Sequence, residues 1–229
     1  MSSELIQYLS GFVTQRRLKL FDSVLDQRTR YMTIVLEDIF QPHNASAVLR
    51  SCECFGIQDI HIIENQNKWG ISPDVALGSH KWLNIYQYNQ NINNTPETFR
   101  LLKSKGYRLV ATSPHKKNSN LEDFDVTQGK FALILGSELN GLSPEALDLA
   151  DEFLKIPMHG FTESLNISVT AAICIHHLTS KLRSLHVAWQ LSQSEKDLLK
   201  LEWLKNSIRK SDLIIKAFHG HRDTENKED

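Results

Sequence analysis

The sequence predicts an α/β fold in which a mostly parallel sheet carries helices on both faces. Between residues 32 and about 185, short apolar and β-branched runs alternate with segments of helical periodicity. Strands that alternate with helices are typical of βαβ units, which join parallel strands. The two flanks show helical patterns only, so three parts are expected: 1–31, 32–185 and 186–229.

The central part contains six apolar runs with the length and composition of strands, at 32–36, 60–63, 83–88, 108–112, 131–135 and 153–156. Helical patterns lie between them at 45–55, 95–104, 144–150 and 169–183. We expect Asn44 to cap the first helix and Gly106 to end the second. Ser143 is the expected cap of the third, with Pro144 at its first position.

The flanks are predicted to be helical and slightly basic. Residues 1–31 place Leu5, Leu9, Phe12 and Val13 at helical spacing, and five basic residues against three acidic ones give a net charge of +2. The basic residues are Arg16, Arg17, Lys19, Arg28 and Arg30. Two interpretations stay open for this patch, a solvated helix face or a surface that meets phosphates.

The second flank begins with a helix signal. Ser192 and Glu195 have capping-box spacing. Residues 186–218 carry six basic and four acidic residues, again a net of +2. Residues 219–229 are polar, and we expect them to be disordered.

Composition limits the class of protein. The 229 residues are 41% hydrophobic and 23% charged, with a net charge of −1, so any nucleic-acid surface must be local. Three cysteines without zinc spacing favour a reducing compartment. No apolar run approaches the roughly 18 residues that span a bilayer, and no signal-peptide pattern is present. These features predict a cytoplasmic protein.

Common cofactor signals are missing. There is no G-x-x-x-x-G-K-[ST] motif, and residues 37–44 after the first strand contain no glycine, which argues against P-loop and dinucleotide-binding folds. His176 and His177 are adjacent, so they would point about 100° apart on a helix. We therefore expect no metal site.

Three strand-to-helix junctions remain as candidate sites. They read PHNASAVLR (42–50), LGSELNGLS (135–143) and IPMHGFTESLNIS (156–168). Taken singly, the first two are weak signals, because Arg50 could be an ordinary surface arginine and two-glycine turns are common. The third places hydroxyl, amide and backbone N–H groups together before an apolar helix, which suits a polar small molecule.

Together these stretches resemble the SPOUT superfamily of RNA methyltransferases, and within it the TrmH/SpoU family of tRNA guanosine 2′-O-methyltransferases. The resemblance also includes LGSHKWL (77–83) and EWLKNSIRKSD (202–212), and it covers residues 15 to 218. One departure is Leu139-Asn140, where the family often carries a Gly-Lys or similar pair.

The resemblance implies a C-terminal trefoil knot, S-adenosylmethionine as cofactor, a homodimer with the site at its interface, and tRNA as substrate. The expected target is guanosine 18 of the D-loop. By position, Arg50 is the catalytic residue. The other expected catalytic residues are Asn44, Glu138, Ser164 and Asn166, and the expected cofactor contacts are Thr112, Leu135, Gly136, Ile156 and Leu165. The family uses no metal.

A sulfonium methyl is already activated, so the enzyme has to align the reactants and make the ribose 2′-OH a better nucleophile; alignment alone removes up to about 7–11 kcal/mol of barrier. Two roles are open for Arg50. It either clamps a phosphate and the developing alkoxide, which the basicity of a guanidinium favours, or accepts the proton itself.

Two other functions stay open. One is a ribosomal-RNA 2′-O-methyltransferase of the same superfamily, and the other is a non-catalytic RNA-binding protein. The LGSHKWL segment and the helical flanks favour tRNA. A protein that only binds RNA would not need all five of the expected catalytic residues, which are Asn44, Arg50, Glu138, Ser164 and Asn166.

Overall fold

The structure, a computed structural model, describes residues 2–113, 119–138 and 140–225, and these residues form two compact units. The larger unit spans Thr29–Trp189. The smaller unit joins the residues up to Arg28 with those from Gln190 onward. The unit that carries the three junction motifs is therefore continuous in sequence.

The larger unit is built on one parallel sheet, whose strands lie in the order β3-β2-β1-β6-β4-β7-β5 among the described residues. β1 and β6 lie side by side and are buried along their whole length, as expected for parallel strands covered on both faces. The strands are β1 (Met32–Glu37), β2 (Asp59–Ile63), β3 (Asn84–Tyr88), β4 (Arg108–Thr112), β5 (Ser119–Asn120), β6 (Phe131–Leu135) and β7 (Glu152–Lys155).

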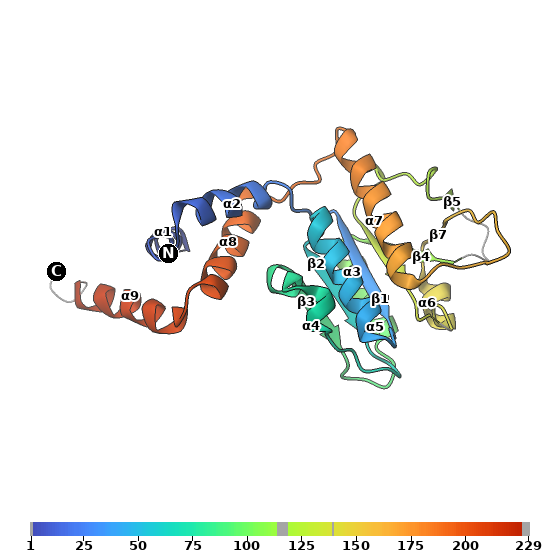
Figure 1. The fold of residues 1–229 in the computed structure, drawn as a ribbon, viewed down its shortest axis with the longest axis horizontal. Coiled ribbons are helices and arrows are strands. Elements are labelled where there is room, and N and C mark those ends of the chain that lie inside the picture. Colours follow the sequence, from blue (N-terminus) through green and yellow to red (C-terminus); the bar gives the residue numbers. More distant parts are fainter. Residues whose placement is uncertain (1, 114–118, 139, 226–229) are drawn as a thin grey trace. The chain divides into compact units, whose positions relative to one another are not determined.

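Helices cover the two faces of this sheet. α3 (Pro42–Phe55) and α7 (Ile167–Ser184) pack against each other over one face (Figure 1), where Ile34 and Leu133 point. α5 (Thr95–Ser104) and α6 (Pro144–Leu149) cover the other face. Because side chains alternate along a strand, β1 and β6 contribute to both cores.

The predicted α/β fold with a mostly parallel sheet is confirmed. The six predicted strands and four predicted helices of the central part are present, with ends that differ by at most three residues. The sequence did not predict α4 (Pro73–Ala76), η1 (Ser79–Trp82) or β5. These elements have four residues or fewer, too short for a periodic pattern.

The prediction that Asn44 caps α3 is wrong. The helix begins at Pro42, and Gln41 is the cap residue, although its side chain makes no capping hydrogen bond. Proline suits the first position of a helix because its missing N–H needs no partner there. Asn44 lies inside the first turn, so its side chain is available for other contacts. Ser143 does cap α6, as expected.

The smaller unit consists of α1 (Ser2–Ser10), α2 (Gln15–Leu25), α8 (Gln193–Ser207) and α9 (Ser211–Glu225). The rings of Phe21 and Trp203 lie 5.5 Å apart, and Lys196 and Lys200 make ion pairs of 2.7 and 2.6 Å with Asp26 and Asp22. α2 and α8 are therefore joined by both apolar and charged contacts.

The flanks match the predictions only in part. The Ser192–Glu195 capping box is present at the start of α8. The helical pattern of residues 1–31 is split at Gly11, and Phe12 is 49% exposed, with its ring against that of Tyr8. α9 continues to Glu225, so the expected disorder is wrong for residues 219–225, whereas 226–229 lie outside the described residues. No helix among the described residues is long and apolar enough to cross a membrane.

A buried histidine on β2 gives the larger unit a sensitivity to acid. His61 is 2% exposed, stacks on Tyr86 and Tyr88, and places Nδ1 2.8 Å from the Tyr88 hydroxyl. Burial, helped by the charge of Lys105, lowers the pKa of His61 to about 4. Burial raises the pKa of Tyr88 to about 12.

We expect the free energy of unfolding to fall as the pH drops from about 6.5 to about 4. In that range the unfolded chain takes up a proton that folded His61 does not, which costs up to about 3 kcal/mol. Urea unfolding at pH 7.5, 6 and 5 would measure the loss. His61→Phe keeps the stacking and should flatten this dependence; an equally steep dependence in the variant would contradict the assignment.

Candidate active site

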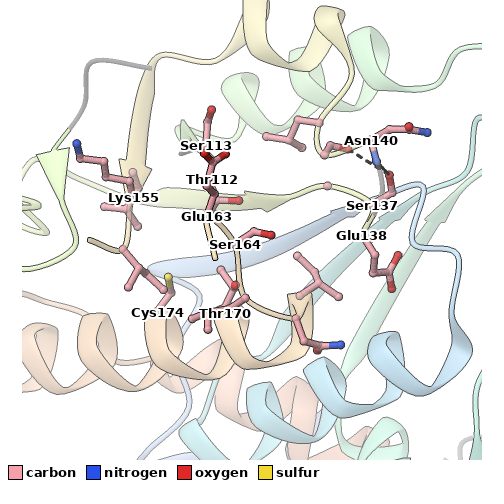
Figure 2. Close-up of a pocket in the computed structure, with 18 of the residues that line it drawn as sticks. Thr112, Ser113, Ser137, Glu138, Asn140, Lys155, Glu163, Ser164, Thr170 and Cys174 are labelled. Atoms are coloured by element: carbon pink, nitrogen blue, oxygen red, sulfur yellow. Dashed lines mark hydrogen bonds between the residues drawn. The ribbon is translucent and has the colours of Figure 1, made fainter. Parts of the chain in front are cut away.

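A cavity of about 550 Å³ opens where β4, β6 and β7 end. Its wall is formed by the end of β4 at Thr112, loop 136–143 after β6, segment 156–166 after β7, and the first turns of α7. Figure 2 shows Glu138 and Lys155 at opposite ends of the cavity, with Ser164 between them. The carboxyl ends of parallel strands are the usual place for ligands in such sheets.

Loop 136–143 folds back on itself at two glycines. Ser137 and Gly141 exchange backbone hydrogen bonds of 2.9 and 3.0 Å, and Gly141 has φ +66°. A Cβ on Gly136 would lie 2.2 Å from the carbonyl carbon of Gly141, closer than any real contact. A residue without a side chain is therefore required for this close approach of the backbone.

Segment 156–166 leads from β7 into α7 without regular structure. Asn166 caps α7, because its Oδ1 accepts hydrogen bonds from the Ser168 N–H at 2.9 Å and the Ser168 hydroxyl at 2.6 Å. The same side chain donates from Nδ2 to Oδ1 of Asn44 at 3.2 Å. This contact joins the third junction to the first.

Asn44 also joins the second junction. Its Nδ2 donates to Oε1 of Glu138 at 2.7 Å and to Oε1 of Gln41 at 3.2 Å, and its side chain is 7% exposed. The other carboxylate oxygen of Glu138, Oε2, is shielded from solvent and has no hydrogen-bond partner among the described residues. A shielded acceptor without a partner is uncommon in a folded protein, so this end of the wall is incompletely satisfied.

Most of the site residues predicted from the sequence gather at this cavity. Asn44 lies behind the wall through its contact with Glu138, and Leu135 is fully buried beneath the wall. Arg50 is exposed on α3, and its side chain makes no hydrogen bond or ion pair with the described residues. Seven of the ten residues line the cavity: Thr112, Gly136, Glu138, Ile156, Ser164, Leu165 and Asn166.

Arg50 lies outside the cavity wall of its own chain. Six positions along a helix correspond to about 600° of rotation, so Arg50 and Asn44 point about 120° apart on α3. Leu139 and Asn140 stand where the family often carries a Gly-Lys or similar pair. Asn140 is exposed and lines the cavity, whereas Leu139 lies outside the described residues. The geometry of a single chain thus assembles the polar set of the three junctions but leaves the arginine apart.

Sequence reasoning missed several residues of the wall, including Lys155, Glu163, Thr170 and Cys174. Lys155 directly precedes the third junction and Glu163 lies within it, and their charge was the available signal. Two carboxylates and one ammonium give this wall an acidic balance that suits a ligand with positive charge. Burial raises the pKa of Cys174 to about 12, so its thiol stays protonated and is no nucleophile.

Comparison with known proteins gives consistent matches. Residues 31–176 match the model of the SpoU rRNA Methylase family. The chain is 43% identical to the tRNA (guanosine(18)-2′-O)-methyltransferase of Borreliella burgdorferi, over 91% of this chain and 94% of that protein.

Solved structures show the same fold. A TrmH/SpoU tRNA modifying enzyme of Aquifex aeolicus superposes with a TM-score of 0.74 and 28% identity, covering 85% of this chain and 98% of that one. The SpoU methyltransferase AviRb of Streptomyces viridochromogenes, solved with AdoMet, gives a TM-score of 0.60 at 21% identity, covering 71% of this chain and 62% of that one.

Gly136→Ala should destabilise the larger unit by about 1–3 kcal/mol, because the new methyl group meets the backbone of Gly141. Gly160→Ala is the matched control, since a Cβ there has no atom within 4 Å. Thermal unfolding of the two variants would measure the difference. Equal melting temperatures would show that loop 136–143 can open without cost.

Proposed function

This chain belongs to the SpoU rRNA Methylase family, and on that premise we propose that it transfers a methyl group from S-adenosylmethionine to a ribose 2′-oxygen of tRNA. The target in this proposal is guanosine 18 of the D-loop. The relative of 43% identity carries that activity in its name, and the match reaches into both terminal flanks because it covers 91% of this chain.

One observation in the structure carries the proposal. Asn44 connects Glu138 and Asn166 through hydrogen bonds of 2.7 and 3.2 Å, so three stretches that are far apart in sequence form one polar wall. All three belong to the pattern by which the sequence resembles the family. A chain that had kept only the scaffold would not need this buried amide network.

The cavity fits S-adenosylmethionine. The chain turns tightly at Gly136 beside the cavity, and the carboxylates of Glu138 and Glu163 outnumber the ammonium of Lys155 in its lining, which suits a sulfonium or ammonium group. Thr112, Gly136, Ile156 and Leu165 would hold the molecule largely through backbone, with Leu135 supporting them from below. When bound, this cofactor supplies a methyl group that is activated by a positively charged sulfur.

A trefoil knot is part of the same proposal. Its support is the family resemblance together with the convergence of loop 136–143 and segment 156–166 on one cavity. A chain that doubles back in this way can present backbone groups from two crossings to one ligand. Threaded topologies are rare, so the knot is proposed from the family and not from general rules of chain topology.

The proposal also includes a homodimer. Exposed apolar side chains recur every three or four residues along segment 156–166 and the start of α7. They include Phe161 at 109% and Val169 at 44%. The others are Met158, Leu165 and Ile173, each 37–39% exposed. A second copy would cover this surface, and a site at such an interface allows Arg50 of one copy to serve the cavity of the other.

Arg50 acts in this proposal on the reacting ribose. A guanidinium keeps its proton at neutral pH, so it is better suited to bind a phosphate and stabilise a developing alkoxide than to accept a proton. Asn44, Ser164 and Asn166 would orient the ribose and the guanidinium by hydrogen bonds. Glu138 would hold Asn44 in place through Oε1 at the edge of the cavity.

The tRNA body would be held by the basic flanks. Only part of the predicted patch is available, because Arg28 is 1% exposed against Trp203 and Arg30 pairs with Asp59 at 3.0 Å. Arg16, Arg17 and Lys19 are exposed on α2. Phosphate contacts of this kind position an RNA without reading its sequence.

Ribosomal RNA is the second candidate substrate, since the family's description names it. The chemistry and residues would be the same. The match, which reaches into both flanks of a tRNA enzyme, favours tRNA, and a cytoplasmic location is part of the same proposal. A non-catalytic RNA-binding protein is disfavoured by the assembled network around Asn44.

With labelled S-adenosylmethionine, the wild-type chain should transfer methyl to unmodified tRNA, at guanosine 18 when the product is mapped. Arg50→Ala should reduce the transfer by at least about 10³-fold, as for loss of an essential electrostatic group, while S-adenosylmethionine affinity stays within about twofold.

Arg100→Ala on α5, another exposed arginine, is the matched control and should change neither quantity. Equal loss of affinity and transfer in Arg50→Ala would make Arg50 structural. Label that enters ribosomal RNA but not tRNA would decide for the second substrate.

Neutralising Arg16, Arg17 and Lys19 to Gln should weaken tRNA binding and flatten its dependence on salt. Each lost phosphate contact should reduce the slope of log K against log salt by about 0.7–0.9. Filter binding from 50 to 200 mM salt would measure it. The control is the double variant Arg100→Gln and Lys130→Gln, which removes two exposed cations of the larger unit. An unchanged slope in the α2 variant would reject α2 as a tRNA-binding surface.

A further inference from the structure

A buried carboxylate stands directly behind the cavity wall, at a position that the sequence did not single out. Glu37, the last residue of β1, is 1% exposed and makes no ion pair with any described residue. Its charge is instead met by hydrogen bonds. Burying a carboxylate is costly unless such bonds replace water, so these contacts are needed for Glu37 to stay where it is.

Two of the bonds come from Ser143, at the end of loop 136–143. The Ser143 N–H donates to Oε2 of Glu37 at 2.9 Å, and its hydroxyl donates to Oε1 at 2.8 Å. The same hydroxyl accepts from the Ala146 N–H at 3.1 Å and caps α6. Glu37 therefore holds the residue at which the cavity loop becomes a helix.

The carboxylate is itself braced from the other side. Thr95 at the start of α5 donates its hydroxyl to Oε1 of Glu37 at 2.5 Å and accepts from Nδ2 of Asn65 at 2.9 Å. Asn65 in turn accepts from the Asn94 N–H at 2.7 Å. The loops that follow β2 and β3 thus fix the carboxylate before it binds Ser143.

Loop 136–143 is consequently held at two points, by one residue of β1 and one of α3. Asn44 of α3 binds Glu138 near the start of the loop, and Glu37 of β1 binds Ser143 at its end. Between these points lie Gly141 and Leu142, which line the cavity. Two anchors on either side of a loop restrict its backbone far more than either alone.

We propose that Glu37 is a positioning residue for the cofactor cavity, which holds loop 136–143 in its binding shape through Ser143. The inference rests on the proposed function, because it takes S-adenosylmethionine as the ligand. It assigns Glu37 no contact with the cofactor or with RNA. Its loss should therefore act on cofactor affinity and leave the RNA surfaces as they are.

Titration of S-adenosylmethionine by calorimetry tests the inference without methyl transfer. Glu37→Ala removes the acceptor of both Ser143 donors and should weaken binding about tenfold or more. Glu37→Gln keeps one acceptor for the Ser143 N–H and should weaken binding less. In turnover assays the KM for S-adenosylmethionine should rise while the KM for tRNA stays unchanged.

Thr33→Val is the matched control for stability. It removes a buried hydrogen bond of 2.6 Å, from Thr33 to the carbonyl of Asp59, on the same strand but away from the cavity. Its melting temperature should fall while S-adenosylmethionine affinity stays within about twofold of wild type. An affinity loss in Thr33→Val as large as in the Glu37 variants would make the effect one of general stability and overturn the inference.

The remaining outcomes separate this inference from the proposed function. A wild-type chain that binds no S-adenosylmethionine would overturn the proposed function. If Glu37→Ala binds S-adenosylmethionine as tightly as the wild-type chain does, only the role of Glu37 is overturned. If Glu37→Ala does not fold, Glu37→Gln decides in its place, and wild-type affinity in that variant overturns the inference.

Discussion

The site depends on one buried amide. Asn44 donates to Glu138 and accepts from Asn166, so a single side chain on α3 joins the loop after β6 to the start of α7. An amide can do this because it offers a donor and an acceptor on one rigid plane. A carboxylate or a hydroxyl of similar size lacks that combination with this reach. The cavity between the loops exists in this shape because both of its walls are tied to the same residue.

The backbone of loop 136–143 makes the second constraint. Gly136 and Gly141 approach so closely that no side chain fits between them, and Ser137 and Gly141 close the turn with two backbone hydrogen bonds. Backbone groups recognise a ligand by shape and hydrogen bonding, with little dependence on side-chain identity. A wall of this kind tolerates the Leu139-Asn140 departure from the family pattern, since the glycines on which the turn depends are kept.

Sequence patterns predicted the larger unit well, because buried parallel strands such as 131–135 read as continuous apolar runs. Most of the predicted wall residues came from the family resemblance, by position, and not from these patterns. Asn44 was misplaced as a cap because Pro42 starts the helix earlier, and residues 219–225 were misjudged because their polar composition hid a helix. Glu37 gave no signal, since an acid at the end of a strand is ordinary until its burial is known.

Arg50 lies apart from the cavity that we propose binds the methyl donor. The cavity of one chain holds carboxylates, amides and backbone groups, which suit a positively charged donor, whereas the exposed guanidinium on α3 suits the anionic side of an RNA substrate. A methyl transfer needs both sides within a few ångströms. The apolar surface around Phe161 and Val169 offers a way to bring them together, because a second copy seated there would be joined at the edge of the cavity itself. In the proposed homodimer, assembly and catalysis would share one surface, and a monomer would bind the donor yet lack the guanidinium that we propose acts on the ribose.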